Sequence, residues 1–289
     1  MSLLSEKNGL TLGFSPCPND TFIFHALVHG QACDGLPNFA EAALADVETL
    51  NEWALAGRLD VTKLSFHALG HVLDRYVLLM AGSALGRGCG PLLVARENFP
   101  PATLPRLTIA IPGRYTTAAL LLRMYSPVAL TTRVMRFDEI MPAIAAGEVD
   151  AGVIIHESRF TFQEHGLLLL QDLGVWWEQE TGFPIPLGGI VAKRSLGKEK
   201  IQAINRCIRA SVSSAFANPE AGMPYIRRHA QELDDKVIKD HIGLYVNPFS
   251  VDLGAEGVAA VREFLKRGRQ LGIFPPQSSV LPLTCNELC

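Results

Sequence analysis

The stretch Gly13-Phe-Ser-Pro-Cys-Pro-Asn-Asp-Thr-Phe22 carries the strongest indication of the fold. It follows an apolar, strand-like run over residues 10–14 and precedes an apolar, helix-like run over residues 22–28. Its two prolines stiffen the turn, and Asn19 and Asp20 place side-chain acceptors where a helix would begin. The stretch therefore predicts a strand–turn–helix unit whose polar groups gather at the carboxyl end of the strand, where open α/β sheets bind small ligands.

The composition is that of a globular protein with enough apolar material for two cores. The chain has 289 residues, of which 48% are hydrophobic and 19% charged, and this length suits one or two domains. The formal net charge is −3 and no long basic stripe occurs, which argues against nucleic acid as a partner. No apolar run approaches the ~20 residues that a membrane helix needs, and the first residues contain no signal-peptide core. We therefore expect a cytoplasmic protein with no membrane partner.

The cysteine spacing predicts free thiols in a reducing compartment. None of the six cysteines forms a Cys-x-x-Cys pair, and their spacings fit no zinc signature. Cys17 lies in the first turn, where a nucleophile would need a nearby base or positive charge. A packing role is the favoured interpretation. The six are Cys17, Cys33, Cys89, Cys207, Cys285 and Cys289.

Strand and helix patterns alternate along the chain, which is typical of an α/β fold. The first series consists of strands over 10–15, 39–45 and 60–65 and helices over 20–30, 47–57 and 67–80. A strand over 90–96 follows, and prolines after it mark a change of unit. The second series consists of strands over 107–111, 128–137 and 151–156, helices over 116–125 and 138–147, and a closing strand over 188–193.

This order predicts two lobes joined by the strands over 90–96 and 188–193. We expect a discontinuous large α/β lobe from residues 1–97 and 190–289, and a small α/β lobe inserted at 98–189. Two amphipathic helices follow the second crossover and are expected to pack back on the first lobe. Their apolar stripes are Ile201, Ile204, Ile208, Val212 and Phe216 in one, and Val258, Val261, Leu265 and Leu271 in the other.

A second polar strand end lies in the segment Asp150-Ala-Gly-Val-Ile-Ile-His-Glu-Ser-Arg-Phe-Thr-Phe162, which delivers His156. Together with the first turn, with Asp60-Val-Thr-Lys-Leu-Ser-Phe66 and with Gly113-Arg-Tyr-Thr-Thr-Ala118, it resembles the family of 1,4-dihydroxy-6-naphthoate synthases of the futalosine route to menaquinone. All four segments keep the family's order over nearly the whole chain. The resemblance implies a two-lobed fold like that of type II periplasmic binding proteins, with the ligand cleft between the lobes.

The resemblance also implies an activity. The family's substrate is cyclic dehypoxanthine futalosine, a bicyclic benzoate with a spiro-linked sugar remnant, and its product is 1,4-dihydroxy-6-naphthoate. This is a carbon–carbon lyase reaction that requires neither a metal nor an organic cofactor. We therefore expect one small-molecule substrate, and closure of the two lobes about the crossover strands to bring both sets of binding residues onto it.

His156 is the first candidate for a general base, because a histidine pKa of ~6.5 allows proton transfer near neutral pH. The family's catalytic histidine falls in this motif, whereas position alone leaves a structural histidine equally acceptable. Thr116 and Thr117 open a predicted helix, where hydroxyls and first-turn N–H groups can hold a carboxylate or hydroxyl oxygen. The family uses this pair for substrate, and plain N-capping is the alternative.

Four more residues are candidates for substrate binding. Lys63 and Ser65 end the third strand and share a face by alternation. Lys63 is suited to the ring carboxylate, unless it is simply solvated. Asp20 and Asn19 are suited to the sugar hydroxyls, although helix capping is a strong alternative for one of them.

Two His-x-x-x-His pairs, His25/His29 and His67/His71, each share a helical face that could chelate a metal. Neither pair has the glutamate that metalloprotease helices place after the first histidine, so a zinc hydrolase is the weakest alternative. Two alternatives share the expected fold. One is a non-catalytic solute-binding protein, which would be secreted, and the other is chorismate dehydratase of the same pathway. The first turn and the His156 motif favour the synthase.

Overall fold

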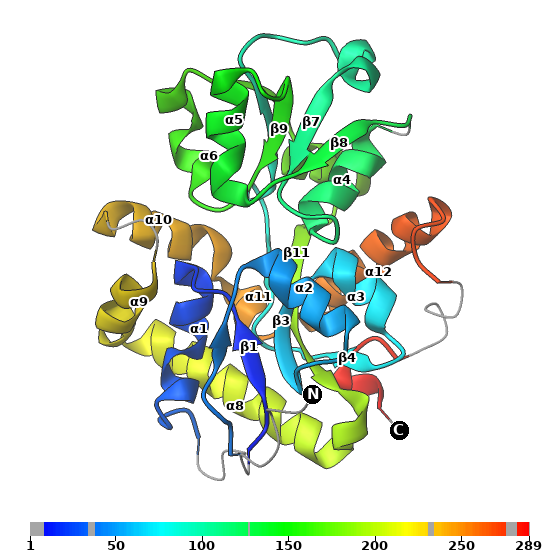
Figure 1. The fold of residues 1–289 in the computed structure, drawn as a ribbon. Helices are drawn as coiled ribbons and strands as arrows, with labels where there is room; N and C mark the ends of the chain where they lie inside the picture. The colour runs from blue at the N-terminus through cyan, green and yellow to red at the C-terminus, as the bar shows by residue number, and fades with distance from the viewer. Residues whose placement is uncertain (1–8, 34–37, 127, 231–233, 276–281, 289) are drawn as a thin grey trace, which may run out of the picture.

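The described residues of the computed structural model form two β-sheets, each covered by helices (Figure 1). In the ribbon view the second sheet and its helices lie above the first, and β11 (Ile185–Lys193) rises from the first lobe toward them. No helix within these residues is both long and apolar enough to cross a membrane. The structure describes residues 9–33, 38–126, 128–230, 234–275 and 282–288.

The first sheet has the order β2-β1-β3-β11-β4, with β5 also paired to β11. Strands β1, β2 and β3 are parallel, whereas β11 runs antiparallel to β3, β4 and β5. All five residues of β3 are buried, as expected for a central strand rich in apolar and β-branched side chains. Besides β11, the strands are β1 (Leu12–Phe14), β2 (Ala43–Leu44), β3 (Val61–Ser65), β4 (Tyr76–Leu78) and β5 (Ala84–Gly86).

The second sheet has the order β10-β6-β9-β7-β8. Strands β7, β8 and β9 are parallel, and β6 and β10 complete the sheet in antiparallel pairings. The lobe boundaries expected from the sequence remain a prediction, but β6 lies before residue 98 and pairs in this second sheet. The strands are β6 (Leu92–Ala95), β7 (Thr108–Ile111), β8 (Thr131–Val134), β9 (Ala151–Ile154) and β10 (Leu168–Asp172).

The helices follow the apolar stripes of the sequence. In α8 the side chains of Ile201, Ile204, Ile208 and Val212 are fully buried, whereas Phe216 at the end of the same stripe is 42% exposed. The helices are α1 (Pro18–Val28), α2 (Val47–Leu55), α3 (Phe66–Val72), α4 (Thr117–Tyr125), α5 (Ile140–Ala146), α6 (Ser158–Thr161), α7 (Leu173–Thr181), α8 (Lys198–Ala217), α9 (Met223–His229), α10 (Asp235–Tyr245), α11 (Pro248–Val251) and α12 (Gly254–Gln270).

The expected helix over 67–80 is wrong in its second half. Helix α3 ends at Val72, and residues 76–78 form β4, which pairs with β11. The run from Tyr76 to Met80 is apolar throughout, and periodicity cannot separate a buried helix segment from a buried strand in so short a run. The expected strand over 151–156 is also too long, because β9 ends at Ile154 and leaves His156 in a turn.

The expectation of free thiols is wrong for one pair of cysteines. Cys33, which follows α1, and Cys207 in α8 form a disulfide between elements that pack together. Their separation of 174 residues explains why spacing gave no indication of the pairing. Cys17, Cys89 and Cys285 have free thiols, and Cys289 lies outside the described residues.

Replacing both Cys33 and Cys207 by alanine should lower the free energy of unfolding by ~2–4 kcal/mol, because the unfolded chain loses a long-range cross-link. Denaturant titration of the wild type and the double variant, each with and without reductant, measures this. Reductant should destabilise the wild type by a similar amount and leave the variant unchanged. A wild type that is insensitive to reductant would contradict the pairing.

Candidate active site

A cavity of about 90 Å³ lies where the two sheets face each other, and all seven candidate residues line it. The first sheet contributes the β1–α1 turn and the end of β3, whereas the second contributes the start of α4 and the turn after β9. Strand ends therefore meet here from both sides, as expected for ligand sites of open α/β sheets. The seven are Asn19, Asp20, Lys63, Ser65, Thr116, Thr117 and His156.

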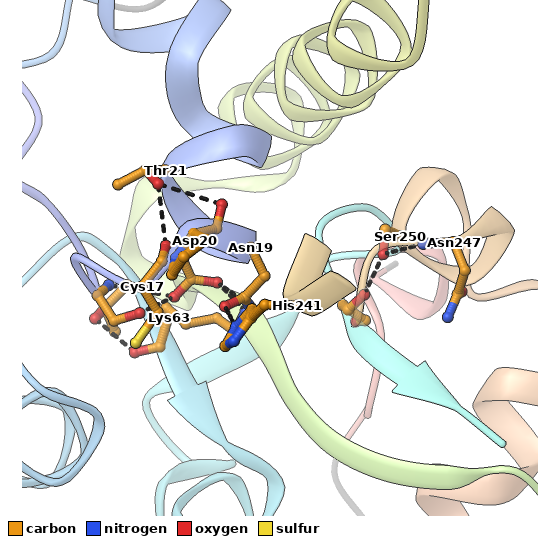
Figure 2. A network of polar contacts seen from close by, with 12 residues as sticks. Cys17, Asn19, Asp20, Thr21, Lys63, His241, Asn247 and Ser250 are labelled. Atoms are coloured by element: carbon orange, nitrogen blue, oxygen red, sulfur yellow. Dashed lines mark hydrogen bonds and ion pairs between the residues drawn. The ribbon is translucent and has the colours of Figure 1, made fainter. Parts of the chain in front are cut away.

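Asp20 and Lys63 form an ion pair at 2.5 Å, with side chains only 2% and 6% exposed (Figure 2). The second carboxylate oxygen of Asp20 accepts from the Ser15 hydroxyl at 2.7 Å and from the Ser15 backbone N–H at 3.2 Å. The Asn19 amide donates to the first oxygen at 2.9 Å. Asp20 is thus fully engaged by protein donors, whereas the ammonium of Lys63 has further protons to offer the cavity.

Ser65 is held at the end of β3 by Asn51 of α2. The Asn51 side chain accepts from the Ser65 backbone N–H at 2.8 Å and donates to the Ser65 hydroxyl oxygen at 3.1 Å. Because that oxygen accepts from Asn51, the hydroxyl proton of Ser65 is directed elsewhere, and the residue lines the cavity. Asn51 carries no motif, and sequence reasoning did not single it out.

Helix α4 begins against the first lobe. Thr116 is its N-cap, since its hydroxyl accepts from the Ala119 backbone N–H at 3.2 Å, and the Thr117 hydroxyl donates to the Leu187 carbonyl at 2.6 Å. Both hydroxyls therefore have structural partners, and N-capping is what Thr116 does. The backbone N–H groups of Thr117 and Ala118 are first-turn donors without partners inside the helix, and they point a partial positive charge at the cavity.

Two further hydrogen bonds fix this turn. Glu48 of α2 accepts from the Tyr115 backbone N–H at 2.9 Å, and a His67 ring nitrogen lies 3.1 Å from the Thr116 carbonyl oxygen. Gly113 permits the approach of Glu48, because a Cβ there would lie 2.5 Å from the carboxylate. Burial lowers the pKa of His67 to about 4, so the ring is neutral near pH 7. His67 thus supports the turn at the start of α4 that lines the first cavity.

His156 sits between two cavities. It lines the first cavity and also a second one of about 230 Å³, which extends toward α10. Its φ of 58° is the only positive value for a non-glycine residue in the described ranges, and such strain is common at functional sites. Phe137 packs edge-on at 5.0 Å. Burial lowers the pKa of His156, opposed by the charge of Glu157, so the imidazole is neutral near pH 7.

Two residues of α10 complete the site without having been identified from the sequence. His241 stacks on His156, with ring centroids 6.0 Å apart and planes 9° from parallel, and Tyr245 lines the first cavity. Both lie on a helix late in the chain with no recognisable motif, more than 80 residues from any other candidate. An unexplained histidine on the apolar face of that helix was the available signal.

The remaining candidates are the possible nucleophile Cys17 and the two histidine pairs considered as metal ligands, and the structure gives little support to either role. Burial raises the pKa of the Cys17 thiol above its usual range, which makes it a poor nucleophile. The His25/His29 pair packs beside Tyr225 at the far end of α1. Among the described residues no group of three or more metal-ligating side chains occurs. The absence of a metal requirement remains a prediction.

The buried ion pair generates a stability prediction. Lys63→Met should lower the free energy of unfolding by ~3–5 kcal/mol, because it leaves Asp20 buried without a counter-charge. Lys239→Met is the matched control, since its pair with Glu220 is 55% and 69% exposed and should contribute less than about 1 kcal/mol. Denaturant unfolding measures both. Equal costs for the two variants would contradict the account of the pair.

Solved structures of other proteins share this architecture. The structure matches that of a protein from Archaeoglobus fulgidus with a TM-score of 0.86 at 32% identity, covering 93% of this chain and 100% of that one. The alkanesulfonate-binding protein SsuA of Xanthomonas axonopodis pv. citri matches with a TM-score of 0.69 at 14% identity, covering 94% and 96%. The two-lobed, periplasmic-binding-protein-like fold expected from the sequence is confirmed.

Sequence comparisons identify the family. A family model described as "Menaquinone biosynthesis" matches residues 10–270. A 1,4-dihydroxy-6-naphthoate synthase of Thermus thermophilus is 53% identical over 267 residues, covering 92% of this chain and 96% of the relative. Another, from Streptomyces coelicolor, is 48% identical over 271 residues, covering 92% and 95%. The seven candidate residues of the first cavity come from the four segments that carry the resemblance, and the chain belongs to the menaquinone-biosynthesis family that includes these two synthases.

Proposed function

We propose that this protein is a carbon–carbon lyase that converts cyclic dehypoxanthine futalosine to 1,4-dihydroxy-6-naphthoate, with His156 as general base. The observation that carries the proposal is the position of His156, which lies on the wall shared by two cavities between the lobes. Its imidazole is neutral near pH 7 and is not committed to any hydrogen bond within the described residues. The activity of the two synthases in the same family supports the assignment.

The first cavity suits the aromatic, carboxylate-bearing part of the substrate. Its walls are largely apolar, and its polar groups include the Lys63 ammonium, the Ser65 hydroxyl and the first-turn N–H groups of α4, which can donate to a ligand, whereas the Asp20 carboxylate is engaged by protein donors. A cation, a hydroxyl donor and a helix N-terminus all favour an anionic oxygen. The ring carboxylate is therefore assigned to this cluster.

The proposed reaction needs one base. His156 removes an acidic proton from the bound substrate, and the electron pair left behind drives cleavage of the carbon–carbon bond to the sugar-derived carbons. The imidazolium returns its proton to the departing fragment, and aromatisation of the remaining bicycle drives the step. Asp20 is not suited to compete as the base, because Lys63, Ser15 and Asn19 already occupy its oxygens. Its role is to hold Lys63 and the first turn in place.

Cavity size bears on how substrate enters. Sites for drug-sized ligands typically measure ~300–1,000 Å³, whereas the first cavity measures about 90 Å³ and the second about 230 Å³. In this proposal the substrate occupies both, and the lobes part to admit it. Such hinge motion is usual for lids and lobes that exclude water from a reaction.

A non-catalytic binding protein and a chorismate dehydratase remain the alternatives. A binding protein of this fold would have no use for a strained histidine between its cavities. Incubation with cyclic dehypoxanthine futalosine, and separately with chorismate, distinguishes the synthase from the two alternatives. Formation of the naphthoate supports the synthase. Consumption of chorismate, or tight binding without turnover, would support an alternative and reject the proposal.

His156→Asn should lower kcat by ~10²–10⁴-fold, because the variant lacks the base. Asparagine is chosen since it tolerates the left-handed backbone conformation at this position. Naphthoate formation followed by chromatography measures the rate, and His25→Ala, distant from both cavities, is the control with wild-type activity. A His156→Asn enzyme with near wild-type kcat would remove His156 from the mechanism.

The acid limb of the pH profile gives an independent test. The pKa of His156 is lowered below the usual ~6.5 of histidine. The imidazole therefore stays neutral until the pH falls to that lowered pKa. The value of kcat/KM should stay constant from pH 8 to about 6.5 and fall as the pH drops through the lowered pKa. A fall that begins above pH 7 would show that the group titrates with a raised pKa and would contradict burial as the dominant influence.

A further inference from the structure

The hydrogen bonds around the first turn determine which nitrogen of His241 carries a proton. The Asn19 amide nitrogen donates to Asp20, so the Asn19 amide oxygen faces the other way and lies 3.0 Å from His241 Nε2 (Figure 2). An amide oxygen only accepts hydrogen bonds, which requires a proton on Nε2. Burial lowers the pKa of His241 well below its usual value, so the ring is neutral. Nδ1 is therefore an unprotonated acceptor.

This acceptor has no partner. His241 is only 1% exposed, and Nδ1 is one of the buried side-chain atoms of the described residues that make no hydrogen bond. The nearest charged atom is a carboxylate oxygen of Glu157 at 3.8 Å. Two acceptors facing each other repel, and a buried polar atom without a hydrogen bond is costly. Both residues line the second cavity, so a ligand donor that reached the enclosed Nδ1 from there would satisfy it and would lie beside the Glu157 carboxylate.

The other groups of the second cavity are already engaged or apolar. Asp46 caps α2 through the backbone N–H groups of residues 48 and 49, and Arg136 is paired with Asp138. The remaining walls include two prolines, Val47, Phe137, Val237 and Ile238. The α10 side of the second cavity thus presents two acceptors, His241 Nδ1 and the Glu157 carboxylate, and no cation of the described residues pairs with either. A neutral hydroxylated group would fit there.

We propose that the second cavity is the subsite for the hydroxylated, sugar-derived part of the substrate. One hydroxyl donates to His241 Nδ1 and a neighbouring hydroxyl donates to Glu157. The inference rests on the proposed function for the identity of the ligand, and it assigns the sugar hydroxyls to His241 and Glu157 instead of Asp20. The substrate then spans both cavities with its carboxylate at Lys63 and its diol at His241, and the carbons to be separated lie beside His156.

Two substitutions of His241 distinguish a role in binding the ligand from a role in supporting Asn19. His241→Asn keeps an acceptor near the position of Nδ1 and loses the bond to Asn19, whereas His241→Gln keeps a donor near the position of Nε2 and loses the acceptor. Calorimetry in the His156→Asn background should show affinity for intact cyclic dehypoxanthine futalosine about threefold to tenfold weaker with His241→Gln, the effect of one hydrogen bond. His241→Asn should weaken it less.

The naphthoate product is the matched ligand, because it lacks the sugar-derived carbons. Its affinity should be the same with and without His241→Gln. Equal losses for substrate and product, or a larger loss for His241→Asn than for His241→Gln, would mean that His241 only supports Asn19 and would overturn the subsite.

Glu157→Gln adds a contrasting readout. Its amide can donate to His241 Nδ1, so the free protein should unfold at a higher temperature while the substrate binds more weakly. A variant that is less stable than the parent and binds substrate equally well would contradict the claim that His241 Nδ1 and the Glu157 carboxylate are two acceptors that face each other.

The test also separates the subsite from the proposed function. If the wild type does not convert cyclic dehypoxanthine futalosine, the proposed function fails. The subsite is then judged with ribose alone, by the ¹⁵N resonance of His241 Nδ1. A ribose-dependent shift that is lost in the Glu157→Gln variant, which retains His241, supports a diol site, and a resonance that ribose leaves unchanged rejects it.

Discussion

The ion pair between Asp20 and Lys63 is the interaction on which the rest of the site depends. It joins the β1–α1 turn to the end of β3 within the first sheet, where both side chains are almost completely buried. A charge buried this way requires a partner and further hydrogen bonds. Asp20 obtains them from Ser15 and Asn19, and Asn19 then orients His241. One electrostatic requirement therefore fixes the lysine that lines the first cavity and the tautomer of a histidine in the second cavity.

The second lobe completes the site by docking the start of α4 on the first. Glu48, His67 and the Leu187 carbonyl hold three consecutive residues of that turn, 115–117. Apolar contacts accompany them, since residues 118–122 of α4 belong to one hydrophobic cluster with residues of the first lobe. In the docked arrangement His156 faces both cavities, between a region rich in donors and a region rich in acceptors. The separation of these two chemistries is what would orient an amphipathic substrate.

The sequence was sufficient to find the residues that end strands, and insufficient for those that reach the site through packing. Lys63, Ser65 and His156 were identified because alternation and strand order place strand ends at one edge of a sheet and because the segments that contain them carry the family resemblance. Asn51 and His241 come from helix faces that carry no local pattern, and only the tertiary structure brings them to the cavities. The same reason explains the unpredicted disulfide and the strand at Tyr76–Leu78. Both depend on long-range partners that a local pattern does not contain.

The central claim is that the substrate lies across both cavities with the bond to be broken beside residue 156. A crystal structure of the His156→Asn variant with intact cyclic dehypoxanthine futalosine tests this most directly. The account predicts the ring carboxylate within hydrogen-bond distance of Lys63 or of the first N–H groups of α4, and the sugar hydroxyls at His241 and Glu157. A substrate bound in the reverse orientation, or held outside the two cavities, would contradict it.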